Sequence, residues 1–170
     1  MYRLMLGISQ AEWISAGPVL EELADKHSED SRYYRVMTAL DYVLESSRLV
    51  GTKNTGNAYL YFILLVCSME RLFSKSEESS KGIHLAERMS EFLSGAKEKN
   101  MEVIKHDYRL RNDLVHAQGL PQIKKEEVRR CCDDWQDFCI EVFKELLLKK
   151  NRIAALPPAR VRKVTPRPTR

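Results

Sequence analysis

The stretch YRLRNDLVHAQG, residues 108–119, places an arginine and a histidine in a segment whose apolar residues repeat with helical spacing. Arg111 precedes His116 by five positions. Histidine is the side chain best suited to transfer protons near neutral pH, and the planar guanidinium of arginine suits a phosphate group. Together they could cleave an RNA phosphodiester, in which the 2′-hydroxyl is the nucleophile. Such a reaction calls for no metal ion and no cofactor.

Helical geometry limits how these side chains can meet. Arg111 and His116 point about 140° apart, because five positions correspond to about 500° of an α-helix. Asn112 lies four positions before His116 and shares its face, so Asn112 could orient the imidazole. Asp113, next to this pair, could do similar work or could simply be solvated. RNA cleavage needs both a base and an acid, and a symmetric dimer would supply two histidines where one chain supplies one.

The segments that position these residues are predicted to be helices. The chain has 170 residues and only 7 glycines, and most of it is free of proline, which favours helix. No stretch shows the alternation typical of a strand. We therefore predict an all-α protein, a helical bundle. The predicted helices are two short pieces within residues 1–27, the second starting at Pro18, and longer ones over 29–49, 57–73, 83–93, 97–117 and 124–150.

The periodicity also predicts which residues face the core. The most apolar run, AYLYFILLVCSM at residues 58–69, is too short to span a bilayer, which takes about 20 residues, so we expect the central core helix there. In the two helices that follow it, the residues expected to face inward include Ile83, Met101, Ile104, Tyr108 and Val115. In the last helix they are Val128, Cys132, Trp135, Cys139, Val142, Phe143 and Leu146.

Charge divides the chain unevenly. Residues 152–170 hold six basic residues, four prolines and no acid. Removing those six from the 28 basic residues leaves 22 against 24 acidic ones, a net charge of −2 for the rest. We therefore expect an N-terminal helical extension over 1–28, a bundle over 29–151, and a disordered basic tail over 152–170. The tail residues expected to contact nucleic acid are Arg160, Arg162, Lys163 and Arg167.

Cysteine usage and the N-terminus indicate a compartment. The four cysteines form no CxxC pair, so neither a zinc site nor a disulfide framework is expected, and a reducing environment fits. The first residues, MYRLMLGISQAEW, do not read as a secretory signal, because their apolar part is short and interrupted by Arg3. We expect a cytoplasmic protein with no membrane partner.

The motif and its flanking segments resemble a known family. RNDLVH, residues 111–116, is similar to the Rx4–6H motif of HEPN domains (higher eukaryotes and prokaryotes nucleotide-binding). Residues 64–119 resemble the Apea-like branch, in which an apolar helix ends in an "xxLExLF"-like box, here CSMERLF, and a "LAxR" helix follows, here HLAERM. Ala117 stands where glycine is common in that branch, a change that affects the turn after the histidine rather than the chemistry.

This resemblance implies a fold and an activity. HEPN domains are helical bundles that dimerise through the motif helices, and many are metal-independent endoribonucleases of toxin–antitoxin and phage-defence systems. By that resemblance His116 would be the acid and base, Arg111 the group that binds the phosphate, and Asn112 a supporting residue. Glu70, in the box, could reach the motif helix and hold Arg111. The expected partners are a second copy of the chain, RNA, and an antitoxin or other regulatory protein.

Other members of the family have lost activity, which leaves a second interpretation open. In it the chain is a non-catalytic HEPN module that dimerises and binds RNA, a nucleotide or a protein. A purely structural helical adaptor is a third. The presence of Arg111, Asn112 and His116 together favours the nuclease.

Overall fold

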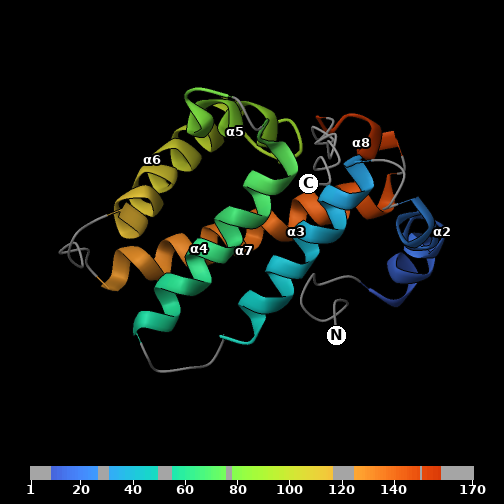
Figure 1. Ribbon diagram of the computed structural model, residues 1–170, viewed down its shortest axis with the longest axis horizontal. Helices are drawn as coiled ribbons and strands as arrows, with labels where there is room; N and C mark the ends of the chain where they lie inside the picture. The colour runs from blue at the N-terminus through green and yellow to red at the C-terminus, as the bar shows by residue number, and fades with distance from the viewer. Residues whose placement is uncertain are drawn as a thin grey trace, which may run out of the picture.

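The protein is an all-α bundle (Figure 1). The structure, a computed structural model, describes residues 9–26, 31–49, 55–75, 78–116, 125–149 and 151–157. All of the regular secondary structure in these ranges is helical. The helices are α2 (Gln10–Lys26), α3 (Ser31–Ser47), α4 (Thr55–Phe73), α5 (Lys81–Met89), α6 (Lys97–His116), α7 (Lys125–Leu148) and α8 (Asn151–Ala154).

Helix α4 is the centre of the bundle, as its apolar sequence predicts. It packs against α3, α5, α6 and α7, and Figure 1 shows α3 running alongside it while α7 crosses it. Phe62, Leu65, Met69 and Leu72 are buried on it, and burial of each such side chain contributes roughly 1.5–3 kcal/mol. Within the described residues, no helix combines the length and the apolar character needed to cross a membrane.

Two arginines from other helices cap the C-terminal end of α4. The last carbonyls of a helix lack partners within it and must find donors elsewhere. Nη1 of Arg35, on α3, donates to the carbonyls of Arg71 at 3.0 Å and Ser74 at 2.7 Å. Nη1 of Arg88, on α5, donates to the carbonyl of Phe73 at 2.6 Å. These contacts connect three helices at the end of the box that contains Glu70.

A buried carboxylate joins α6 to α7. Asp107 is fully buried, and its Oδ2 accepts a hydrogen bond of 3.1 Å from Nε1 of Trp135, which is also fully buried. Its other oxygen lies 2.9 Å from Nδ1 of His106 and 3.5 Å from Nη2 of Arg130. A buried carboxylate without such partners would be strongly destabilising, so the set of donors accounts for its position in the core.

The N-terminal helix begins earlier than predicted. We expected a helix to start at Pro18, but α2 runs from Gln10 through Pro18 without a break. Ser9 and Glu12 explain the early start, because they form a capping box. The Ser9 hydroxyl accepts from the Glu12 backbone N–H at 3.2 Å, and the Glu12 carboxylate accepts from the Ser9 N–H at 2.7 Å. Helix α2 packs on α3 and α7.

The predicted inward faces are correct for α7 and wrong at two positions elsewhere. All seven residues predicted to face inward from α7 are buried. Ile83 and Val115, in contrast, are 45% and 46% exposed. Helix α5 also ends at Met89 rather than at 93, because the chain then turns through residues 90–95 and Gly95 adopts a φ of 90°.

The boundary predicted for the tail is wrong. Residues 152–156 do not extend as a disordered segment, because α8 packs on α3 and α7 and buries Ile153 together with Leu156. Nε of Arg152 lies 3.3 Å from a carboxylate oxygen of Glu145, and its guanidinium lies 5.1 Å from the ring centre of Phe92. The tail residues predicted to contact nucleic acid lie outside the described residues.

The ion pair between Glu78 and Arg88 predicts a pH dependence of stability. The hydrogen bonds from Arg88, opposed by burial, lower the pKa of Glu78 from 4.5 to about 2. The pair therefore contributes fully above about pH 4.5 and loses its contribution as the pH falls towards 2. We expect Glu78→Gln to lower the free energy of unfolding by roughly 1–2 kcal/mol at neutral pH, measured by urea denaturation. The difference from the wild type should close in acid; a difference independent of pH would contradict this assignment.

Candidate functional site

Arg111 lies against α4, held by a carboxylate. Its Nη2 donates to Oε2 of Glu70 at 2.8 Å and to Sγ of Cys67 at 3.4 Å, and its Nη1 donates to Oδ1 of Asn112 at 3.0 Å. The side chains of Arg111 and Glu70 are 15% and 18% exposed. Partial burial strengthens a charge-assisted hydrogen bond of this kind, so the guanidinium has a defined position. Glu70 thus reaches the motif helix in the way the resemblance suggested.

Tyr108 occupies the other oxygen of Glu70. Its hydroxyl donates to Oε1 at 2.7 Å, and its ring centre lies 5.8 Å from the guanidinium carbon of Arg111. Burial, the hydrogen bond to Glu70 and the charge of that carboxylate all raise the pKa of Tyr108, so the phenol stays protonated and donates at neutral pH. One carboxylate on α4 therefore receives two donors from successive turns of α6.

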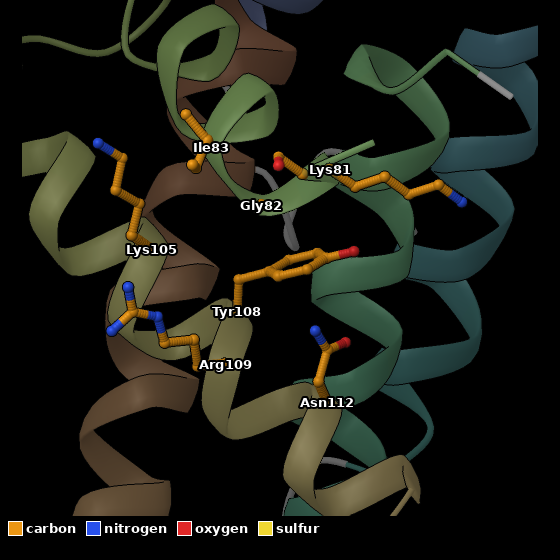
Figure 2. A pocket seen from close by; sticks show the side chains of 8 residues that line it. Lys81, Gly82, Ile83, Lys105, Tyr108, Arg109 and Asn112 are labelled. Carbon is orange, nitrogen blue, oxygen red and sulfur yellow. The ribbon is translucent and has the colours of Figure 1, made fainter. Parts of the chain in front are cut away.

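The N-terminal turn of α5 approaches the Tyr108 ring closely. A Cβ at Gly82 would lie 2.6 Å from Cδ1 of Tyr108, well inside van der Waals contact. Figure 2 shows the Gly82 backbone directly beside the ring. Glycine at this position therefore allows α5 and α6 to pack at this separation.

The structure does not bring His116 to the other motif residues. Helix α6 continues to His116, so the large angular separation from Arg111 persists in the folded chain. The His116 side chain is exposed and forms no hydrogen bond with any residue in the described ranges. The prediction that Asn112 orients its imidazole is not met, because the Asn112 oxygen accepts from the charged guanidinium of Arg111 instead. Asp113 is exposed.

A hollow of about 350 Å³ lies between α5 and α6, next to these residues. We call it the α5–α6 hollow. Among the described residues that line it, three are cations and none is acidic. In Figure 2, Tyr108 lies at its centre, and Lys105 and Arg109 project together from α6. The residues that line it are Ser80, Lys81, Gly82, Ile83, Lys105, Tyr108, Arg109 and Asn112.

Sequence reasoning missed most of this hollow. Lys105, Arg109 and Asn112 recur at intervals of four and three positions, so they share one face of α6, and that spacing could have been noticed. Lys81 and Gly82 come from a different helix. Only the packing of α5 on α6 brings them to this face, and no local pattern in the sequence predicts it.

Cys131 and Cys132, on α7, do not supply a nucleophile. Burial raises the pKa of Cys132 to about 11 and that of Cys131 to about 12, so both thiols are protonated at neutral pH. All four cysteines are free. In the ranges that the structure describes, no group of three His, Cys, Asp or Glu side chains is placed to bind a metal ion.

No protein-family model, curated protein or solved structure matches this chain. The resemblance to HEPN domains therefore stays a prediction that depends on the residues quoted for it. What the structure shows of these residues is that Arg111 contacts Glu70 and Asn112 and that His116 is exposed.

The shared use of Glu70 predicts an energetic coupling between Tyr108 and Glu70. We expect Tyr108→Phe to lower the free energy of unfolding by about 1–2 kcal/mol, because it leaves one oxygen of a partly buried carboxylate without its donor. In a Glu70→Gln background the loss should be smaller, with a coupling energy of about 1 kcal/mol in a double-mutant cycle. Tyr61→Phe serves as the control, since its hydroxyl bonds an exposed neutral partner, Gln136. Additive losses would contradict the arrangement.

Proposed function

We propose that the protein is a metal-independent endoribonuclease of HEPN type that acts as a homodimer. The observation that supports this proposal is the contrast along α6: Arg111 is held by Glu70 and Asn112, whereas His116 is exposed at the end of the same helix. One group is positioned, and the other is accessible to a substrate. The attack of the 2′-hydroxyl on the adjacent phosphorus would leave a 2′,3′-cyclic phosphate and a free 5′-hydroxyl.

The proposed roles follow from the chemistry of each group. His116 removes the proton from the 2′-hydroxyl or donates one to the leaving 5′-oxygen. Arg111 stabilises the negative charge that develops on the phosphorane oxygens, and its contact with Glu70 keeps it oriented before substrate binds. Asn112 contacts Arg111 and also lines the α5–α6 hollow, so it connects the arginine to the surface where substrate would lie.

A dimer would complete the site. The reaction needs an acid and a base at the same time, and each chain contributes one histidine from the motif. Val115, next to His116, is 46% exposed, so an apolar side chain is available for a second copy to cover. A two-fold axis near the ends of the two α6 helices would bring both His116 side chains to one phosphodiester.

The biological setting is proposed from the resemblance alone. A toxin or phage-defence effector in the cytoplasm would act on cellular or invading RNA. An antitoxin or other regulatory protein would restrain it. The basic residues of the C-terminal segment, Arg160 to Arg167, would add salt-dependent affinity for RNA.

One observation favours the alternative, a non-catalytic module. Arg111 is only 15% exposed, and its guanidinium already contacts Glu70, Cys67 and Asn112. An arginine satisfied in this way could serve only to pack α6 on α4. In that case the protein would bind RNA, a nucleotide or a protein partner without cleaving RNA.

A cleavage assay separates the two. The purified full chain is mixed with end-labelled RNA in excess EDTA, and the product ends are analysed. We expect the wild type to cleave the RNA and His116→Ala to cleave it about 100-fold more slowly. His84→Ala, which removes another partly exposed histidine, should cleave like the wild type. Absence of cleavage of varied RNAs by the folded wild type would favour the non-catalytic module.

Mixed dimers test whether the site spans two chains. Wild-type and His116→Ala chains are dissociated, mixed in varied proportions and reassembled. If both histidines are required, activity should fall with the square of the wild-type fraction, so that an equal mixture keeps about a quarter of it. A site contained in one chain would keep about half. Mixtures with His84→Ala should keep full activity.

A further inference from the structure

The α5–α6 hollow has a neighbour that shares one of its cations. A second hollow of about 270 Å³ lies between the C-terminal part of α4, α3 and the start of α5, and we call it the α3–α4 hollow. Lys81 lines both. The residues that line the α3–α4 hollow are Arg35, Tyr42, Cys67, Glu70, Arg71, Ser74, Lys75 and Lys81.

In the described part of the chain, no acidic side chain pairs with the cations of the α5–α6 hollow. Within the described part of the chain, Lys81, Lys105 and Arg109 form no ion pair and no side-chain hydrogen bond with a neighbouring residue. Lys105 and Arg109 are four positions apart on α6 and project on the same side of the Tyr108 ring (Figure 2). Their positive charges add, so this hollow attracts anions.

The α3–α4 hollow is also positively charged. Glu70 is the one acidic residue among its described lining residues, and it already accepts hydrogen bonds from Arg111 and Tyr108 through its two oxygens. Arg71 and Lys75 have no ion pair with any described residue. Nε of Arg71 and the hydroxyl of Ser74 are buried without a hydrogen-bond partner. These two groups are donors that a bound anion could satisfy.

The two hollows call for a ligand with more than one anionic group. Figure 2 shows the Lys81 side chain extending away from Lys105 and Arg109, on the opposite side of Tyr108. A single phosphate between the α6 cations would therefore not engage Lys81 in the same way. A chain of phosphates could place one phosphate in each hollow, and the segment between these phosphates would contact Lys81.

We propose that a single-stranded phosphodiester chain binds across both hollows, with Lys81 contacting it where they join. The choice of RNA as that chain rests on the proposed function; the recognition of successive phosphates does not. Tyr108 lines one hollow and Glu70 the other, and the two side chains are hydrogen-bonded. A strand that occupies both hollows would therefore pass near this hydrogen bond and near Asn112 of the motif, which lines the α5–α6 hollow.

Binding is measured separately from cleavage. The probe is a fluorescein-labelled single-stranded RNA whose 2′-hydroxyls are methylated, so that it cannot be cleaved through them. Anisotropy titrations of the full chain are carried out in EDTA over a range of KCl concentrations. The variants are Lys81→Ala and Lys105→Ala/Arg109→Ala. The matched control is Lys99→Ala/Arg129→Ala, which removes the same two kinds of charge from exposed positions outside both hollows.

The expected result is a change in salt dependence. The slope of log Kd against log salt should decrease by roughly 0.7 for Lys81→Ala and roughly 1.4 for the double variant. Each missing cation leaves one phosphate without its protein contact, so the RNA releases fewer counterions when it binds. The control should keep the wild-type slope, and the basic C-terminal segment is the same in every protein. Circular dichroism confirms that each variant is folded.

The outcomes are distinct. Equal losses of affinity for the Lys105→Ala/Arg109→Ala variant and the control would overturn the proposal. Competition by polyglutamate as effective as that by unlabelled RNA would also overturn it. DNA of the same sequence binding with the same dependence on Lys81 supports phosphate recognition and removes only the preference for RNA. Binding that depends on Lys81, Lys105 and Arg109, without any cleavage of unmodified RNA, would support this proposal and contradict the proposed nuclease activity.

Discussion

Two carboxylates determine how α6 sits in the bundle. Glu70, on α4, receives donors from Arg111 and Tyr108, and Asp107, on α6 itself, receives the indole of Trp135 from α7. Few apolar side chains on α6 are buried, so apolar packing alone would define its rotation poorly. Hydrogen bonds to charged groups are directional and costly to leave unmade once partly buried. The orientation of the motif residues therefore depends on polar contacts made up to three turns away from His116.

Much of the fold could be predicted because the relevant information is local. The inward face of α7 follows from apolar residues three and four positions apart, and α4 follows from its continuous apolar run. The errors arose where one local rule competes with another. Pro18 predicts the start of a helix, whereas the Ser9–Glu12 capping box starts α2 earlier. Ile83 and Val115 fit the apolar period but lie at helix positions that the described residues leave exposed.

The contacts of the candidate site could be predicted less well than the helices. Arg111 and His116 stand out by residue type, and the pairing of Arg111 with Glu70 came from the resemblance rather than from any spacing. Helical spacing predicts that Asn112 pairs with His116, but the Asn112 oxygen accepts a hydrogen bond from Arg111. Spacing indicates which side chains are close to one another, but it does not indicate which of the nearby donors forms the stronger hydrogen bond. Lys81 and Gly82 could not be placed, since their position depends on how two helices pack.

The caps of α4 have a consequence for cooperativity. The last turn of the central helix is completed by Arg35 and Arg88, which lie on separate helices and are far apart in the sequence. The side-chain caps at the end of α4 are therefore complete only when both α3 and α5 have docked, and undocking either one removes donors from its last carbonyls. Local fraying at this end should thus be suppressed, so that amide hydrogens of the final turn exchange mainly through opening of the whole bundle.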